Sequence, residues 1–299
     1  MARHRIIDEP VSRLAVWARR IALFSLAATV LSIIIVRSGA LEIVPALSTF
    51  AGALMLAAVA ILLAVSALIV IWFEGIAGMK QALAALIIGV ALIAYPAYLG
   101  IKASRLPAIY DITTDPIDPP RFDAIARLRP RDANPITYEG LYAAEQQHTA
   151  YSDIEPDLTD STAQEAYDAA LKVITKRKWR IVDARPPQGG QPAAPNVRNP
   201  AAAFAGREGI IEAIARTPIM GFRDDVVVRI RATSDGARID VRSASRYGRH
   251  DFGANAARVR NLTNDIDDVL ALPKKPAPAP TPPKPLKPPP GGKGPQARR

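Results

Sequence analysis

The chain has 299 residues, three histidines and no cysteine, and its formal net charge is +10. The absence of cysteine excludes disulfides, thiolate metal sites and a cysteine nucleophile, and with so few histidines we expect neither a metal site nor a cofactor. The positive charge belongs to residues 1–20 and 273–299, so residues 21–272 are neutral overall, and a nucleic-acid partner, which needs a basic face on the folded domain, is not expected.

Three long apolar runs occupy the first third of the chain. They cover residues 21–36, 47–73 and 82–101 and contain no acid or base. A helix of roughly 20 apolar residues crosses the hydrocarbon core of a bilayer and satisfies its own backbone hydrogen bonds. The runs therefore predict three transmembrane helices. A cleaved signal peptide is a competing interpretation of the first run, but its length and the two runs that follow favour an uncleaved anchor.

The composition of the runs predicts an anchor and not a transport pathway. A pathway for ions or protons needs ionisable groups inside the membrane, and the runs have none. Small residues at helical spacing suit close packing within an anchor or a homo-oligomer. They are Ala53, Ala57, Ala60, Ala64, Ala85 and Gly89.

Lysine and arginine set the expected orientation, because basic flanks tend to stay in the cytoplasm. Residues 1–20 carry five bases and the second loop carries Lys80, whereas the opposite side carries Arg37, Lys102 and Arg105. This bias predicts a multi-pass inner-membrane protein with a cytoplasmic N-terminus and its C-terminal domain outside, in the periplasm. Further bases from Arg121 onward keep a cytoplasmic domain open as the alternative.

The region after the spans predicts one α+β domain. Residues 103–162 are rich in proline but carry too many aromatic residues for a passive linker, so we expect them to lie across the domain, with a short helix at 122–128. Helices at 163–178 and 254–271 flank four strands at 179–184, 209–217, 225–233 and 237–245. The expected fold is an antiparallel four-stranded sheet with its helices packed on one face.

Two other segments are expected to be irregular. Residues 186–206 contain two glycines in sequence and several prolines, which predicts a mobile insertion. Residues 273–299, rich in proline and lysine, cannot bury a core and predict a disordered tail of polyproline type. The chain therefore divides into a basic cytoplasmic segment (1–20), a three-helix membrane anchor (21–102), the soluble domain (103–272) and the tail (273–299).

Charged residues share one face of the last two predicted strands. If Asp235 and Gly236 form a two-residue turn, Arg229 faces Arg242 and Arg231 faces Asp240, while the alternate valines and isoleucines face the helices. A similar pairing sets Glu212 opposite Arg229. Opposed arginines are unfavourable unless something negative lies between them.

We expect this face to look outward or into a groove. It is either a solvated, self-neutralised salt lattice or an anion site around its arginines. The candidate ligand-binding residues are Arg229, Arg242, Arg246, Glu212, Asp225 and Asp251.

The sequence offers no familiar catalytic arrangement. Ser243, Ser245 and His250 lie close together, but no nucleophile elbow surrounds either serine. The acids between residues 153 and 160 lack the glycine and closing glutamate of a calcium-binding loop. Asp251 and Asn255 are interpreted first as capping residues of the final helix. No catalytic residue is assigned.

Several segments carry distinctive motifs. They are Asp-Ile-Thr-Thr-Asp at 111–115, Pro-Pro-Arg-Phe at 119–122, Ala-Tyr-Ser-Asp-Ile at 150–154 with Pro156, Phe-Arg-Asp-Asp-Val-Val-Val-Arg at 222–229 and Val-Arg-Ser-Ala-Ser-Arg-Tyr-Gly at 241–248, continued by Asp251, Gly253, Asn255, Ala256 and Arg258. Their order resembles an uncharacterised family of envelope-associated proteins catalogued as domain of unknown function 1499, over residues 110–272. Ser152 departs from the family, which often has proline there. The resemblance implies a domain and no established reaction.

The leading hypothesis is a non-enzymatic, membrane-anchored envelope module that binds a lipid, cell-wall or protein partner through the arginine-rich strand face. One alternative is a hydrolase or transferase that acts on an anionic envelope substrate, with Asp225, Arg246 and Asp251 in a cleft. Another is an oligomeric membrane scaffold whose helices and tail perform its function. The expected partners are the bilayer itself and an anionic lipid or cell-wall polymer.

Overall fold

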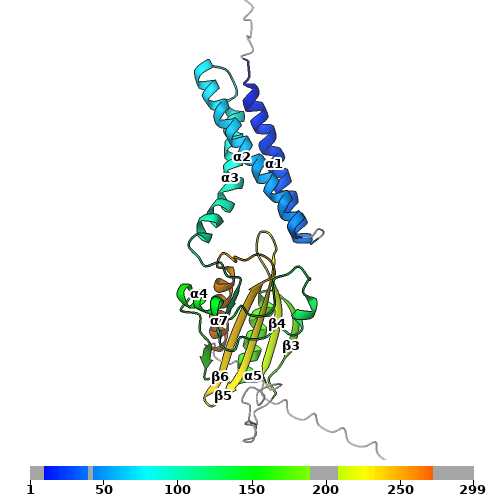
Figure 1. The fold of residues 1–299 in the computed structure, drawn as a ribbon, viewed down its shortest axis with the longest axis vertical. Helices are drawn as coiled ribbons and strands as arrows, with labels where there is room; N and C mark the ends of the chain where they lie inside the picture. Colours follow the sequence, from blue (N-terminus) through cyan, green and yellow to red (C-terminus); the bar gives the residue numbers. More distant parts are fainter. Residues whose placement is uncertain (1–9, 40–42, 189–207, 272–299) are drawn as a thin grey trace, which may run out of the picture.

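The computed structural model describes residues 10–39, 43–188 and 208–271. Three long helices form a bundle at one end of a mixed α/β domain (Figure 1). They are α1 (Arg13–Ser38), α2 (Ile43–Glu74) and α3 (Met79–Ala103), and each is long and apolar enough to cross a membrane. The predicted spans are confirmed as helices, and they indicate a membrane protein. The predicted tail and most of the 186–206 segment lie outside the described residues.

Small residues bring the three helices close together. Alanines from all three helices form one buried cluster: Ala18, Ala22, Ala60, Ala64 and Ala85. A Cβ atom on Gly89 would lie 2.6 Å from Cγ1 of Ile61, so α2 and α3 touch where glycine leaves room. The small residues of the spans therefore pack within the chain, and association into a homo-oligomer stays a prediction.

The domain is built on a six-stranded sheet in which every pair of strands is antiparallel. Its order is β1-β6-β5-β4-β3, and β2 also pairs with β6. The strands are β1 (Asp111–Thr113), β2 (Asp157–Thr159), β3 (Arg180–Arg185), β4 (Gly209–Arg216), β5 (Arg223–Thr233) and β6 (Gly236–Ser245). The expectation of four strands is wrong, since β1 and β2 also belong to the sheet. They were not predicted because each is only three residues long and gives no alternating pattern.

Helices α5 (Ala163–Lys176) and α7 (Ala254–Ala271) pack on one face of the sheet, as predicted. Thr162 begins α5 with a capping box, in which its hydroxyl accepts a hydrogen bond from the N–H of Glu165 and its own N–H donates to the Glu165 carboxylate. The turn η1 (Ile125–Leu128) is a 3₁₀ helix where a short helix was expected, and α4 (Leu141–Ala150) was not predicted.

The hairpin between β5 and β6 has a register two residues away from the expected one. Thr233 pairs with Gly236, so the turn consists of Ser234 and Asp235. The expected turn needs a positive φ at Asp235, but Gly236 alone of these three residues has one. As a result Arg229 faces Asp240, and Arg242 faces Val227. The same displacement between β4 and β5 sets Glu212 opposite Val227. Because the displacement is even, each side chain stays on its predicted face.

The pKa of Asp157 leads to a testable effect of pH on stability. Burial and the neighbouring carboxyl of Asp267 raise the pKa of Asp157 to about 6. A carboxyl with a raised folded-state pKa favours folding most below its unfolded pKa of about 4 and loses that contribution as pH rises to about 6. Asp157→Asn should therefore stabilise the protein at pH 7 by about 1 kcal/mol, after allowance for partial exposure, and much less near pH 4.

Denaturant unfolding of the full chain in detergent at the two pH values measures this difference. Asp235→Asn, at the exposed hairpin turn, is the control and should change stability little at either pH. An equal gain at both pH values for Asp157→Asn would contradict the prediction.

Candidate functional site

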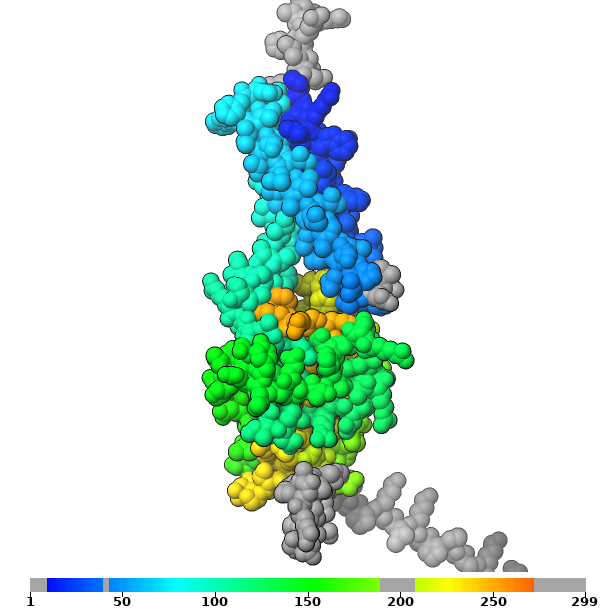
Figure 2. Space-filling model, viewed as in Figure 1, coloured from blue at the N-terminus to red at the C-terminus, as the bar shows by residue number. Residues whose placement is uncertain are grey.

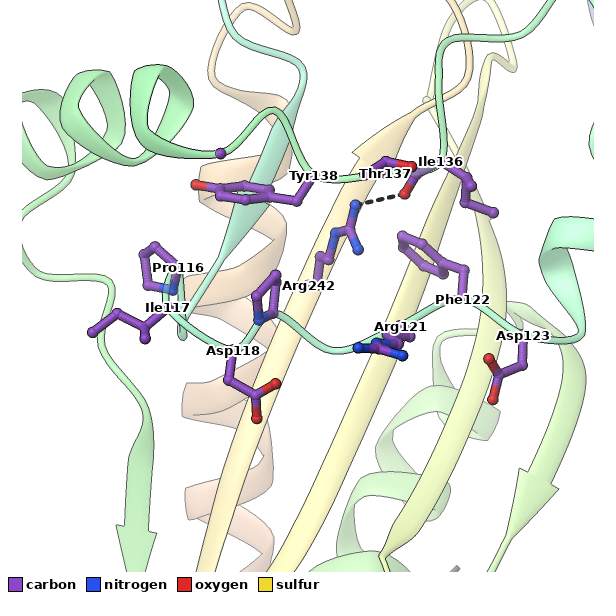
Figure 3. A pocket seen from close by; sticks show the side chains of 12 residues that line it. Pro116, Ile117, Asp118, Arg121, Phe122, Asp123, Ile136, Thr137, Tyr138 and Arg242 are labelled. Atoms are coloured by element: carbon purple, nitrogen blue, oxygen red, sulfur yellow. Dashed lines mark hydrogen bonds between the residues drawn. The ribbon is translucent and has the colours of Figure 1, made fainter. Parts of the chain in front are cut away.

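A segment at residues 114–138, which we call the strap, crosses the face of the sheet opposite α5 and α7 (Figure 3). The expectation that this part of the chain lies across the domain is confirmed. The charged residues beneath it are buried, with relative exposures of 0% for Glu212 and Asp225 and 3% for Arg242. The expectation of a solvated face is wrong, because the strap covers it. The alternative of a groove applies to Arg242, which lines a cavity at the strap, and the expected self-neutralised salt lattice is present but buried.

Three arginines surround Asp240 near the hairpin end of this face. Its Oδ2 accepts hydrogen bonds from Arg229 at 2.9 Å and Arg231 at 2.7 Å, and its Oδ1 accepts one from Arg238 at 2.9 Å. Asp118 of the strap lies 3.0 Å from both Arg229 and Arg231. Asp115 of the strap lies 3.6 Å from Arg229, so Arg229 is neutralised by one acid from β6 and two from the strap.

Arg242 occupies the middle of the face and ties β1, β6 and the strap together. Its Nε and Nη2 donate to the two oxygens of Asp111 at 3.0 and 2.6 Å, and its remaining bonds reach the carbonyls of Pro120 and Ile136. The guanidinium lies between the rings of Phe122 and Tyr138, at 4.8 and 5.6 Å from their centroids. Burial raises the pKa of Asp111, although the charge of Arg242 opposes that shift.

Asp225 holds two arginines at the end of the face nearest the spans. Its Oδ1 accepts from Nε and Nη2 of Arg246 at 2.9 and 2.7 Å, and its Oδ2 accepts from Nε of Arg129 at 2.8 Å. The Nη1 of Arg129 donates to the carbonyl of Asn134. Asp225 and Arg246 are thus brought together as predicted, but they bind each other inside the protein.

Glu212 fixes the strap to the sheet through its backbone. Its carboxylate accepts hydrogen bonds from the N–H groups of Asp123, Ala124 and Ile125 at 3.0, 3.0 and 2.8 Å. These N–H groups lie just before and at the start of η1, where the turn leaves backbone donors without partners of its own. Glu212 therefore lies on the charged face as predicted, but it binds backbone N–H groups and not Arg229.

Asp251 does not join the other five candidate residues. It lies at the start of α7, where its carboxylate accepts from the N–H groups of Gly253 and Asn255, both at 2.8 Å. Its interpretation as a capping residue is confirmed. Asn255 instead binds the hydroxyls of Ser243 and Ser245 and the carbonyl of Tyr110.

The two serines and His250 do not form a catalytic group. Ser243 donates to Asn255, and the hydroxyl of Ser245 accepts from the same side chain. His250 Nε2 lies 3.1 Å from the carbonyl of Ala103 at the end of α3. In the part of the chain that the structure describes, no group of three His, Asp or Glu side chains is placed to hold a metal ion.

A cavity of about 540 Å³ opens between the strap and the beginning of α4 (Figure 3). It is lined by Pro116, Ile117, Asp118, Pro119, Arg121, Phe122, Asp123, Ile136, Thr137, Tyr138, Gly140 and Arg242. Prolines and aromatic rings give it an apolar wall, and Arg242 contributes to it. The Tyr138 hydroxyl is buried without a hydrogen-bond partner, and burial raises the pKa of Tyr138. We call this hollow the strap cavity.

Sequence reasoning missed the acids and aromatic residues of the strap. Asp115 and Asp118 of the strap pair with arginines of the sheet, and Phe122 and Tyr138 enclose Arg242. Asp111 of β1 neutralises Arg242, and Arg129 of the strap pairs with Asp225. The signal that could have found them was charge balance, because a neutral domain with several arginines on one strand face needs an equal number of acids elsewhere. Charge balance alone does not identify which acids pair with these arginines.

Comparison with known proteins agrees with this geometry. The family model described as "Protein of unknown function (DUF1499)" matches residues 111–266, which run from the acid that binds Arg242 to the last buried turn of α7. The chain belongs to the DUF1499 family. The suspected membership is therefore confirmed. The match begins at β1 and includes the strap, so the family domain contains both sides of the buried ion pairs. No curated protein and no solved structure shows a significant similarity to the chain.

Proposed function

We propose that this protein is a membrane-anchored, non-enzymatic binding module of the cell envelope, and that the strap cavity receives its partner. In this proposal the N-terminus is cytoplasmic, three helices cross the inner membrane and the domain is periplasmic, in accord with the bias of basic residues. The observation that carries the binding role is the Tyr138 hydroxyl, which is buried without a hydrogen-bond partner beside a cavity, on a face whose buried arginines are ion-paired.

The lining of the cavity favours a partner that is part apolar and part anionic. Ile117 is 97% exposed and stands at the rim beside Pro116, so apolar surface is available for contact. Arg121 is exposed and forms no ion pair within the described residues, which gives the rim a free positive charge. We propose an anionic cell-wall polymer or an envelope protein as the partner.

The contacts of the former catalytic candidates favour a non-enzymatic role. A hydrolase or transferase using Asp225, Arg246 and Asp251 needs them free and close together. Asp225 and Arg246 satisfy each other, and Asp251 caps α7. The charged face therefore supports the shape of the strap cavity, and these three residues are engaged with other groups of the protein.

One experiment tests both topology and binding. Thr137→Cys places a single thiol at the exposed rim of the cavity in a chain without cysteine. A membrane-impermeant thiol reagent should label it in intact cells, but more slowly than in protein purified in detergent, because the partner covers the rim. The matched control is Arg127→Cys, which is exposed and does not line the cavity. It should be labelled at the same rate in both samples.

The outcomes separate the two parts of the proposal. Protection of both thiols until the cells are lysed would reverse the topology. Equal labelling rates of Thr137→Cys in cells and in purified protein would overturn binding at the strap cavity.

A further inference from the structure

The end of the domain nearest the spans is joined to them by direct contacts. The loop at residues 217–222 connects β4 and β5 and lies at this end, next to the end of α1 (Figures 1 and 2). Nη1 of Arg37, in the last turn of α1, donates to the carbonyls of Pro218 and Ile219 at 2.6 and 2.9 Å. The point where the first span ends is therefore fixed against the sheet.

A cavity of about 390 Å³ lies at this junction, with one wall from the spans and one from the domain. Val36, Arg37 and Ile43 come from the ends of α1 and α2, and Arg223 and Arg246 come from the ends of β5 and β6. The apolar surfaces of α1 and α2 end at this cavity, so a molecule bound in it lies at the depth of lipid headgroups.

A second hollow of about 240 Å³ continues the same surface and shares Arg223 with the first. Its lining is basic, with Arg177, Lys178, Arg180, Arg216 and Arg223 around Trp179 and Ile214. Five bases across the two hollows are exposed and form no ion pair within the described residues. They are Arg37, Lys178, Arg180, Arg216 and Arg223, which we call the basic collar.

Acids do not balance the collar locally. Asp132 lines the first cavity, and it is the one acid among the residues that line either hollow. Asp265 of α7 pairs at 2.7 Å with Arg177, which lines the second hollow but is not part of the collar. Asp267 and Asp268 lie further along α7, and since Gly253, just before α7, lies beside Lys102 of α3, they are near the end of α7 away from the spans.

We propose that the basic collar binds the phosphate groups of anionic phospholipids. Guanidinium groups bind phosphate through paired hydrogen bonds, and basic groups beside a membrane are attracted to its anionic lipids. The source of the phosphate is a lipid because span ends form one wall of the cavity and because Ile219, 42% exposed, puts an apolar loop tip beside Arg37. This site is separate from the strap cavity and does not depend on which side of the membrane the domain occupies.

Trp179 provides a direct reporter of binding. The chain has three tryptophans, and Trp17→Phe with Trp72→Phe leaves only Trp179, at the rim of the second hollow. We would titrate this full-length protein in neutral detergent with phosphatidylglycerol and, separately, with phosphatidylcholine of the same chains. We expect a saturable change in Trp179 fluorescence with phosphatidylglycerol, weakened by added salt, and little response to phosphatidylcholine.

Two matched variants assign the effect to the collar. Arg216→Gln with Arg223→Gln should weaken phosphatidylglycerol binding roughly tenfold or more, given the contribution of each base near an anionic surface. Arg127→Gln with Lys172→Gln removes the same charge from exposed residues that form no ion pair and do not line either hollow, and should leave binding unchanged. Arg216→Lys with Arg223→Lys keeps the charge and should retain most of it, which separates loss of binding from loss of fold.

Three results would overturn the proposal. They are equal responses to the two lipids, equal weakening by the two glutamine variants, and saturation of the Trp179 response by inorganic phosphate at the same concentration. The last result would identify a site for free phosphate and not for a lipid.

Discussion

Replacing Asp225 by alanine is expected to unfold the soluble domain or bring it close to unfolding. Asp225 is fully buried and holds both Arg246 and Arg129, whose side chains are 2% and 5% exposed. Removing one partner of a buried ion pair costs about 3–5 kcal/mol because it leaves a charge without compensation, and here two charges are left. That loss is comparable to the total stability of many domains, which is about 5–15 kcal/mol.

The measurement is denaturant unfolding of the full chain in detergent, followed through the near-UV circular dichroism of the domain. Asp265→Ala is the matched control, because it removes an aspartate paired with Arg177 at 2.7 Å whose side chain is 50% exposed. It should cost no more than about 1 kcal/mol. Similar losses for the two variants would show that the buried face does not depend on its charges.

Gly236→Ala is expected to have the second largest effect, because the backbone of β2 occupies the space of its side chain. Gly236 has a φ of +146°, and a Cβ atom there would lie 2.0 Å from the carbonyl oxygen of Thr159. Alanine must therefore adopt an unfavourable backbone conformation and also displace β2 from β6. We expect a loss on the order of 3 kcal/mol or more.

Gly140→Ala separates these two causes. Gly140 also has a positive φ, of +70°, but no atom lies within 4 Å of the position of its Cβ. It should show only the backbone cost, on the order of 1 kcal/mol. Thermal unfolding midpoints of the two variants in detergent give the comparison, and equal losses would contradict the contact with Thr159.

Helices whose apolar residues repeat over many positions were predictable from the sequence. The three-residue strands and the register of the hairpin were not. The predicted limits of α7 match the observed helix, because Val259, Leu262 and Ile266 repeat at helical spacing and are buried. The strands β1 and β2 could not be predicted, since three residues do not establish a period. The hairpin register failed because Ser234, Asp235 and Gly236 offer two overlapping two-residue turns, and local preference does not distinguish them.

The sequence predicted which candidate residues share one face of the sheet, but it did not predict that this face is buried. The alternation of residues along β5 and β6 placed Arg229, Arg242 and Asp225 on one face, and they do lie there. Their burial depends on partners far away in the sequence, such as Asp111, which lies 131 positions before Arg242. Periodicity reports which face a side chain occupies, and it carries no information about a distant segment that covers that face.

The strap also determines the order in which the domain can fold. Its residues leave the membrane anchor first, yet Glu212, Arg229 and Arg242, which they bind, lie 87, 111 and 122 positions later in the sequence. Contacts of such long sequence separation require closure of large loops before any of them stabilises the chain, so folding is slow for a domain of this size. We therefore expect the strap to complete its contacts only after β6 has been synthesised, late in the folding of the domain.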